Sequence, residues 1–466
     1  MSETRERDLG ARRAWAVEEF GGGQLGNKSR TRRLVAMAER AAEAPAGQLT
    51  KVFTRPDELE AAYRWVENVN FNEKDVGSAA HTACAQRCAH EGFVFVPLDG
   101  CTLSVTDITA LKGFGKVGTR ETRGRGVEVM NAIAVSSDGT PLGLCGQAWW
   151  TRRNEAQQVP SRKRRLHEKE TRHWLKALES VNGTFNAAGI TTPRWFQLDA
   201  GGDFRELLAW AEQSDQLLTV RAAQNRRVAD DDRYLWQTVA ASPSLGQLEL
   251  FIPRGRKRQS RMAELEVRSR KVTLQLSGGL GETSLWAVLV EEVAGTTPKS
   301  EAPISWLLLT NANVESFENA SLVVYGYSQR WRVEEFHKAW KSVCKVEESQ
   351  LEVMAFKLWA TILASIAMRV ERLKYLARNE PEQAATVELT ATELAAIIAL
   401  KGNRPPSDYV KSRTPTIGQA VLWIAELGGY VGRKRSGGPP GTIVIGRGLR
   451  DIETAVRVLV NTAGHV

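Results

Sequence analysis

Apolar residues follow two different spacings along the chain. Up to about residue 75 they recur every three or four positions, which is typical of amphipathic helices. From Gly92 they form short runs rich in β-branched and aromatic residues, which predict strands. The expected strands are 93–99, 127–136, 141–150, 193–199 and 216–222. Because helical stretches separate the later strands, we expect an α/β fold with a mixed five-stranded sheet flanked by helices.

The second half predicts further units. Short alternating segments over about 232–300 indicate an antiparallel β insertion. Within it Arg254–Lys271 holds eight basic and two acidic residues, which favours a nucleic-acid patch. A buried strand over 305–310 then leads into one long helix from about Glu315 to Val343. We therefore expect a helical N-terminal domain (1–75), a central domain (76–372) and a helical C-terminal domain (373–466).

Composition narrows the class of protein. The 466 residues carry a net charge of +9 and a pI near 9.3, which favours a polyanionic partner. The five cysteines are few and scattered, so a disulfide framework is not expected. The N-terminus lacks the apolar segment of a secretory signal, and the apolar stretch Leu358–Met368 is too short to span a membrane. These features predict a soluble protein of a reducing compartment.

One helix concentrates reactive and cationic side chains. At about 100° per residue, Tyr327, Arg330, Glu334, Lys338 and Lys341 fall within an arc of roughly 80°. Its neighbouring face is apolar and packs. The simpler interpretation is an exposed face with a Glu334–Lys338 pair.

Two acidic residues end apolar strands. Asp99 and Asp199 each close such a run, where side chains leave the sheet edge. Together with Glu334 they supply the ligands of a two-metal site, because carboxylate oxygens suit Mg²⁺ or Mn²⁺. Two such ions about 3.5–4 Å apart activate the attacking oxygen and stabilise the leaving oxygen in phosphoryl transfer. We expect the three carboxylates to converge, with Asp99 and Asp199 on neighbouring strands.

The sequence resembles bacterial cut-and-paste transposases with a DDE motif, of the insertion-sequence-four family and the transposon-five type. Its motif Y-x2-R-x3-E-x6-K is matched by Tyr327, Arg330, Glu334 and Lys341 within RWRVEEFHKAWK. The two catalytic aspartates of the family correspond to Asp99 in LDGCTLS and Asp199 in LDAGGDF. LGNKSRTRRL (25–34) and AAYRWVENVNF (61–71) also resemble N-terminal segments of these enzymes.

The resemblance implies an RNase H-like catalytic core and a C-terminal dimerisation domain. It implies binding of transposon-end inverted repeats, metal-assisted nicking with two Mg²⁺ ions per site (Mn²⁺ can substitute), hairpin formation and strand transfer into target DNA. It also implies a homodimer on paired ends, located in the bacterial cytoplasm and on the nucleoid. Trp306 would stack against a flipped base, unless it is a core residue. DNA phosphates would be held by Tyr327, Arg330, Lys338, Lys341 and Arg221.

Two further clusters have alternative interpretations. The basic helix over 30–44 suggests phosphate contacts by Arg30 and Arg33, or else a solvated face. His81, Cys84, Cys88 and His90 superficially resemble a zinc site, but all four fall within ten residues without the usual longer loop between pairs. We favour a packed helix face there. For the whole chain the alternatives are an end-binding regulator or relic without cleavage, and an RNase H-like structure-specific nuclease.

Overall fold

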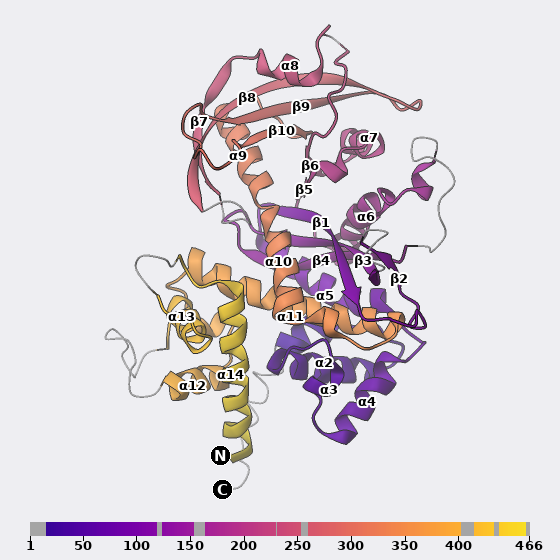
Figure 1. Ribbon diagram of the computed structural model, residues 1–466, viewed down its shortest axis with the longest axis vertical. Coiled ribbons are helices and arrows are strands. Elements are labelled where there is room, and N and C mark those ends of the chain that lie inside the picture. Colours follow the sequence, from indigo (N-terminus) through magenta and orange to yellow (C-terminus); the bar gives the residue numbers. More distant parts are fainter. Residues whose placement is uncertain are drawn as a thin grey trace.

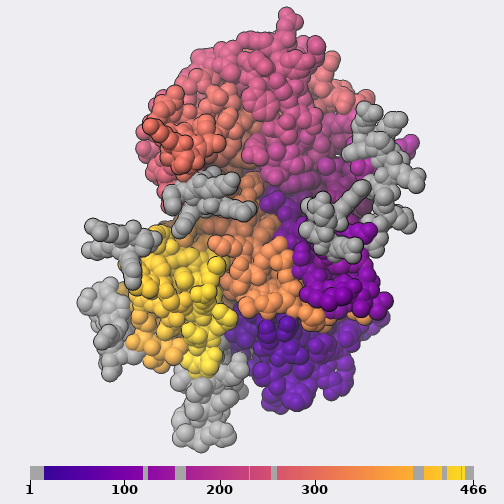
Figure 2. Space-filling model, viewed as in Figure 1, coloured from indigo at the N-terminus to yellow at the C-terminus, as the bar shows by residue number. Residues whose placement is uncertain are grey.

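The computed structural model describes residues 15–118, 124–152, 164–229, 231–252, 260–401, 414–432 and 438–462. The middle of the chain forms one mixed sheet with helices packed against it (Figure 1). The expected α/β class is therefore confirmed. Helices from the two ends of the chain lie side by side below the sheet, as the indigo and yellow regions of Figure 2 show.

The sheet has ten strands in the order β2-β3-β1-β5-β6-β10-β9-β8-β7, and β4 also pairs with β3. β1 is parallel to β5 and β5 is parallel to β6, whereas the other pairs are antiparallel. The strands are β1 (Val94–Val105), β2 (Gly115–Val117), β3 (Gly124–Val135), β4 (Pro141–Trp150), β5 (Arg194–Leu198), β6 (Leu217–Arg221), β7 (Ser244–Ile252), β8 (Arg261–Leu276), β9 (Gly281–Glu292) and β10 (Ser305–Thr310).

The sheet is larger than the five strands expected. β4, β3, β1, β5 and β6 are those five, but the strands of the insertion continue the same sheet. β10 pairs with β6 on one edge and with β9 on the other. All of β10 except its first residue is buried. A buried strand left at a sheet edge would hold unpaired backbone groups, and β9 removes that edge.

Helices surround the sheet. They are α2 (Lys28–Glu43), α3 (Leu49–Val52), α4 (Pro56–Val66), α5 (Glu73–Arg87), α6 (Arg172–Ala187), α7 (Arg205–Gln213), α8 (Leu235–Ala240), α9 (Phe317–Ser328), α10 (Trp331–Ser342), α11 (Val353–Asn379), α12 (Ala391–Lys401), α13 (Ile417–Leu427) and α14 (Thr442–Thr462). Residues 15–20 are also helical.

α11 lies at the centre of the molecule. It contacts β4, α5 and α10 as well as α2 from the N-terminal part and α13 from the C-terminal part. Among the described residues it is the one helix long and apolar enough to cross a membrane, but 78% of its apolar window is buried inside the protein. Its apolar surface therefore serves as core, since a helix that is apolar all round must be buried.

The long helix expected over about Glu315–Val343 is two helices. α9 ends at Ser328 and α10 begins at Trp331. At this junction the backbone N–H groups of Arg330, Arg332 and Val333 bond to carbonyls three residues back, which tightens the turn. The predicted arc that places Tyr327 on one helix face with Arg330, Glu334, Lys338 and Lys341 is therefore wrong, because it assumed one uninterrupted helix.

Candidate catalytic and DNA-binding site

The two aspartates lie where the parallel pairing of β1 and β5 ends. β1 itself continues to Val105 and Asp99 pairs with Asn131 inside it, so the expectation that Asp99 closes its strand is wrong, whereas Asp199 does follow the last residue of β5. In the parallel pair of β1 and β5, Leu98 is the partner of Leu198, and each is followed by one of the two acids. Asp99 accepts a hydrogen bond from the backbone N–H of Gly100 at 2.8 Å, and Asp199 from that of Gly201 at 2.7 Å. The expectation that Asp99 and Asp199 lie on neighbouring strands is confirmed.

Glu334 lies in the first turn of α10, and Arg330 connects it to the sheet. Arg330 Nη2 is 2.6 Å from Glu334 Oε1, and Arg330 Nη1 is 3.8 Å from Asp99 Oδ2. The Arg330 side chain is 13% exposed, whereas that of Glu334 is 51% exposed. One largely buried guanidinium therefore lies between the carboxylate of the strand and that of the helix.

The electrostatics show that the three carboxylates act on one another. Burial raises the pKa of Asp99 to about 7; Arg330 counteracts this, while Asp199 and Glu334 raise it further. Burial by itself lowers the pKa of Arg330, but Glu334, Tyr327 and Asp99 outweigh it and raise that pKa. Because Asp199 and Glu334 both raise the pKa of Asp99, a cation bound beside these carboxylates would be favourable.

The carboxylates are neighbours, but they are not assembled around one point. Within the described parts of the chain, no three His, Cys, Asp or Glu side chains are placed to hold one metal ion. The expected convergence at metal-bridging distance is therefore not seen in this arrangement and stays a prediction for the metal-bound site. The physical reason is the ion pair, since Arg330 engages Glu334 and takes the place of a cation between Glu334 and Asp99. The donor chemistry still suits Mg²⁺, which needs only one or two carboxylates.

Tyr327, Arg221 and Trp306 adjoin this site. Burial raises the pKa of Tyr327, while the nearby Arg330 and Arg221 lower it, so both guanidiniums lie close to the phenol. The ring of Trp306 packs edge-on against Tyr327 at 5.1 Å and against Trp331 at 6.0 Å. Trp306 is only 7% exposed. It is thus a core side chain here, and stacking on a base would require it to move.

The two lysines of α10 differ in their surroundings. Lys341 donates a hydrogen bond to the carbonyl of Thr102 on β1 at 2.6 Å and lies 3.2 Å from Glu347. It is therefore held against the strand that carries Asp99. Lys338 is exposed. Both lie on the helix of Glu334, and their contact with DNA stays a prediction.

The basic residues of α2 also differ in their contacts and in their exposure. Arg30 donates to the carbonyl of Leu25 at 3.0 Å, and its guanidinium lies 5.9 Å from the ring of Phe71. Arg33 is exposed, as is Arg32, which lines a hollow of about 810 Å³ with Lys28. Arg33 is thus better placed than Arg30 to reach a phosphate.

Several basic side chains of the stretch over 254–271 are already paired with carboxylates within the protein. Residues 254–259 lie outside the described residues. In β8, Arg261 pairs with Glu292, Arg268 with Glu266, and Arg270 with Asp231. Side chains already paired with carboxylates are weak candidates for a nucleic-acid patch.

The zinc alternative has no support from the geometry. His81, Cys84 and Cys88 are buried, whereas His90 is exposed. Among the described residues no group of metal-ligating side chains includes them. The preferred interpretation of a packed helix face agrees with this arrangement.

A buried polar chain behind Asp99 was not foreseen from the sequence. Asn131 of β3 is the register partner of Asp99, and its Nδ2 lies 2.9 Å from His337 Nε2 on α10. Gln147 donates to Asn131 at 2.8 Å. Burial, with the charges of Lys341 and Arg330, lowers the pKa of His337 to about 3, so the imidazole is neutral. The only signal was His337 inside the motif segment, and its partner depends on strand register.

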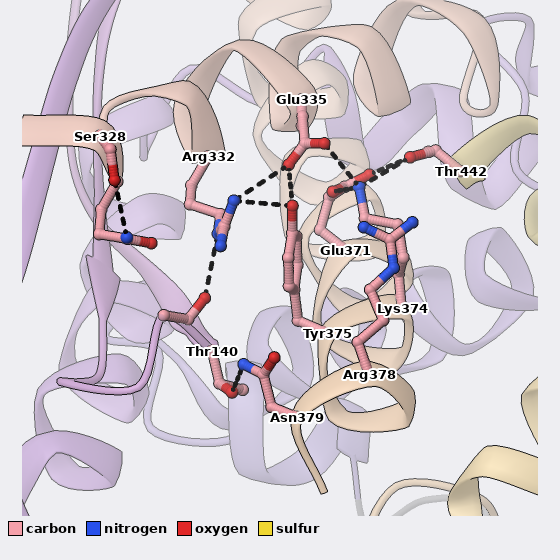
Figure 3. Close-up of polar contacts among 12 residues, drawn as sticks. Thr140, Ser328, Arg332, Glu335, Glu371, Lys374, Tyr375, Arg378, Asn379 and Thr442 are labelled. Atoms are coloured by element: carbon pink, nitrogen blue, oxygen red, sulfur yellow. Dashed lines mark hydrogen bonds and ion pairs between the residues drawn. The ribbon is translucent and has the colours of Figure 1, made fainter. Parts of the chain in front are cut away.

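A second network, of hydrogen bonds and ion pairs, joins Arg332 and Glu335 of α10 to α11 (Figure 3). Glu335 accepts a hydrogen bond from Tyr375, and its carboxylate lies 3.4 Å from Lys374 and 3.8 Å from Arg332. Burial by itself raises the pKa of Glu335, but the cations outweigh it and lower that pKa. Lys374 also pairs with Glu371, whose other oxygen accepts from Thr442 of α14 at 2.6 Å. The helix that carries Glu334 is thereby tied to α11 and to the C-terminal helix.

Comparison with known families identifies the N-terminal part. Residues 12–71 match the family model described as transposase DNA-binding. The match covers α2, α3 and α4 and lies inside the N-terminal domain predicted over 1–75. It supports a DNA-binding protein of the transposase class and makes DNA its partner.

Proposed function

We propose that this protein is a metal-dependent DDE transposase of the insertion-sequence-four family that cleaves transposon ends and joins them to target DNA. The observation that supports the proposal is the closeness of Asp99, Asp199 and Glu334, whose charges act on one another, in a chain whose N-terminus matches a transposase DNA-binding domain. The strand order β4-β3-β1-β5-β6 is compatible with an RNase H-like core.

The three carboxylates would hold the metal. When bound by Asp99, Asp199 and Glu334, two Mg²⁺ ions would supply an activated oxygen nucleophile and stabilise the leaving oxygen. Mn²⁺ has the same preference for oxygen ligands and would substitute. For Glu334 to take part, its carboxylate must separate from Arg330, and a DNA phosphate is a suitable new partner for that guanidinium.

The remaining residues would bind and orient DNA. Arg330, Tyr327 and Arg221 form a cluster that can hold a phosphate beside the carboxylates, while Lys338 and Lys341 extend the positive charge along α10. The N-terminal domain would bind the inverted repeat. A homodimer on paired ends, hairpin formation and location on the nucleoid belong to the same proposal and rest on the family resemblance.

The test uses DNA that carries the inverted repeats flanking the encoding gene. Purified full-length protein with Mg²⁺ should give nicks, hairpins and joined products on a denaturing gel. Glu334→Gln should bind the same DNA and give none, whereas Glu318→Gln, an exposed glutamate of α9, should behave as wild type. Binding without cleavage by wild-type protein on correct ends would favour the end-binding regulator. Cleavage of branched DNA irrespective of end sequence would favour the structure-specific nuclease.

A further inference from the structure

A short turn between α10 and α11 lies beside the candidate site. It consists of Lys345 and a 3₁₀ helix, Val346–Glu348. The 3₁₀ helix contacts both α10 and β1, the strand that contains Asp99. The turn therefore packs against two of the elements that supply the candidate carboxylates.

Glu347 of this turn joins the last turn of α10 to β1. Its Oε1 accepts a hydrogen bond from the backbone N–H of Ser104 at 2.7 Å and lies 3.2 Å from Lys341 Nζ. Lys341 Nζ also donates to the carbonyl of Thr102 at 2.6 Å. An ammonium group has three N–H donors, and these two contacts leave one of them for a further acceptor. Because the Lys341 side chain is 34% exposed, that donor can reach a phosphate.

The backbone of the turn has a shape that a lysine rarely adopts. Lys345 has φ +51° and ψ +39°, in the left-handed region where a Cβ is disfavoured. Its carbonyl accepts from the N–H of Glu348 at 2.9 Å, which closes the turn. A residue other than glycine stays in this conformation only where its surroundings impose it. Contacts with the rest of the protein must therefore hold the turn.

One such contact comes from the N-terminal domain. A Cβ at Gly47, in the loop between α2 and α3, would lie 2.3 Å from the carbonyl oxygen of Lys345 and 3.1 Å from that of Val346. Only glycine allows two backbones to approach so closely. Val346 is fully buried. A loop inside the region that matches the DNA-binding family is thus packed directly against the turn of Glu347.

We propose that Glu347 is a positioning residue for Lys341 and holds its ammonium group, together with β1, where it binds a phosphate of the DNA. The proposal rests on the proposed function and adds a residue to that site. Lysine is a point charge on a flexible four-carbon stem, so fixing it in advance removes the cost of ordering it during the reaction. The loop of Gly47 acts through the turn, because it sets the backbone that carries Glu347.

The test separates DNA binding from cleavage. Full-length wild type, Glu347→Gln, Lys341→Met and the double variant are compared on transposon-end DNA with Mg²⁺, by equilibrium binding and by single-turnover nicking. Glutamine keeps an oxygen acceptor for the N–H of Ser104 but loses the charge. Glu347→Gln should nick about tenfold more slowly because Lys341 is displaced. Its affinity for the DNA and its melting temperature should match those of wild type, since the N-terminal domain binds the transposon end.

The double variant distinguishes positioning from a structural role. If Glu347 acts through Lys341, the double variant should nick no more slowly than Lys341→Met alone. A structural role would instead add the two losses and lower the melting temperature of Glu347→Gln. Glu348→Gln is the matched control and should nick as wild type does. Its partners, Lys51 and Lys345, form exposed ion pairs with it, and such pairs contribute little.

Gly47→Ala tests the part played by the N-terminal loop. The added methyl group should displace the turn and slow nicking as Glu347→Gln does, with DNA binding retained. Gly22→Ala has open space around its methyl group in the same domain and should behave as wild type. Nicking by Gly47→Ala at the rate of wild type would overturn the role given to this loop.

The remaining outcomes also decide the proposal. Equal nicking by Glu347→Gln and wild type would overturn it directly. Tighter binding and faster nicking by Glu347→Gln would show that this carboxylate competes with DNA for Lys341, which is the opposite role. A wild type that cuts no end DNA refutes the proposed function and the positioning together. A wild type that cuts, with Glu347→Gln equal to it, refutes the positioning alone.

Discussion

Leu98 of β1 lies opposite Leu198 of β5 in a parallel pair, so Asp99 and Asp199, which follow them, lie at the same end of this pairing. This one register brings together two residues that are a hundred positions apart in the sequence. Glu334 lies on α10, where Arg330 is paired with it at 2.6 Å. The strands thus fix the positions of two carboxylates. The position of the third, that of Glu334, depends on its ion pair with Arg330.

Arg330→Lys should impair cleavage more than DNA binding. Lysine keeps the charge but loses the planar fork that reaches Glu334 and Asp99 together. We expect single-turnover nicking to slow by about 10–100-fold, as is typical when a partner of metal-binding residues is lost. Arg233→Lys, at an exposed arginine paired with Asp231, is the matched control. Undiminished nicking by Arg330→Lys would contradict a role for this side chain at the site.

His81 should make the protein less stable in mild acid. Burial lowers its pKa to about 4 from the usual 6.5, and its Nε2 is buried without a partner. Because the folded state holds the neutral ring, this contribution to stability is complete above pH 6.5 and is lost as pH falls towards 4. The loss amounts to about 3 kcal/mol at most.

The measurement is the melting temperature of two variants between pH 4 and pH 8. His81→Leu should show a weaker loss of stability on acidification than wild type. His90→Leu changes an exposed histidine and should follow wild type. If His81→Leu and wild type have the same pH dependence, His81 does not titrate as its burial implies.

Lys374→Met should strongly destabilise the contact between α11 and its neighbours. Lys374 is 3% exposed and Glu371 is 1% exposed, so the substitution leaves a buried carboxylate without its cation (Figure 3). Breaking one partner of a buried pair costs about 3–5 kcal/mol. Calorimetry should show a lowered melting temperature. The double variant Glu371→Leu/Lys374→Met should recover part of the loss, and a double variant as unstable as the sum of both singles would argue against the pairing.

Gly448→Ala should loosen the C-terminal helices. A Cβ at Gly448 would lie 1.7 Å from the carbonyl oxygen of Ile424, so α13 and α14 could no longer approach so closely. Overpacking of this kind costs about 1–3 kcal/mol. Hydrogen exchange should become faster over α13 and α14. Gly438→Ala has open space around its added methyl group and should leave exchange unchanged.

Much of the fold follows from local patterns. The apolar runs predicted β1, which contains Asp99, and β5, which Asp199 follows, because runs of β-branched and aromatic residues favour a sheet. The spacing before residue 75 likewise predicted α2 and α4. The break between Ser328 and Trp331 was not predictable in this way, since Gln329 and Arg330 have ordinary helical propensities and the tightening depends on packing.

The candidate site, too, depends partly on local sequence and partly on tertiary contacts. The sequence by itself determined which carboxylates and cations are available, because the motif of Tyr327, Arg330, Glu334 and Lys341 is contained in one short segment. Tertiary structure alone decided that Arg330 pairs with Glu334 and approaches Asp99. It also decided that Trp306 packs against two aromatic rings and that His337 contacts Asn131. These contacts join segments distant in the chain, and strand register and helix packing, which local propensity does not encode, set their distances.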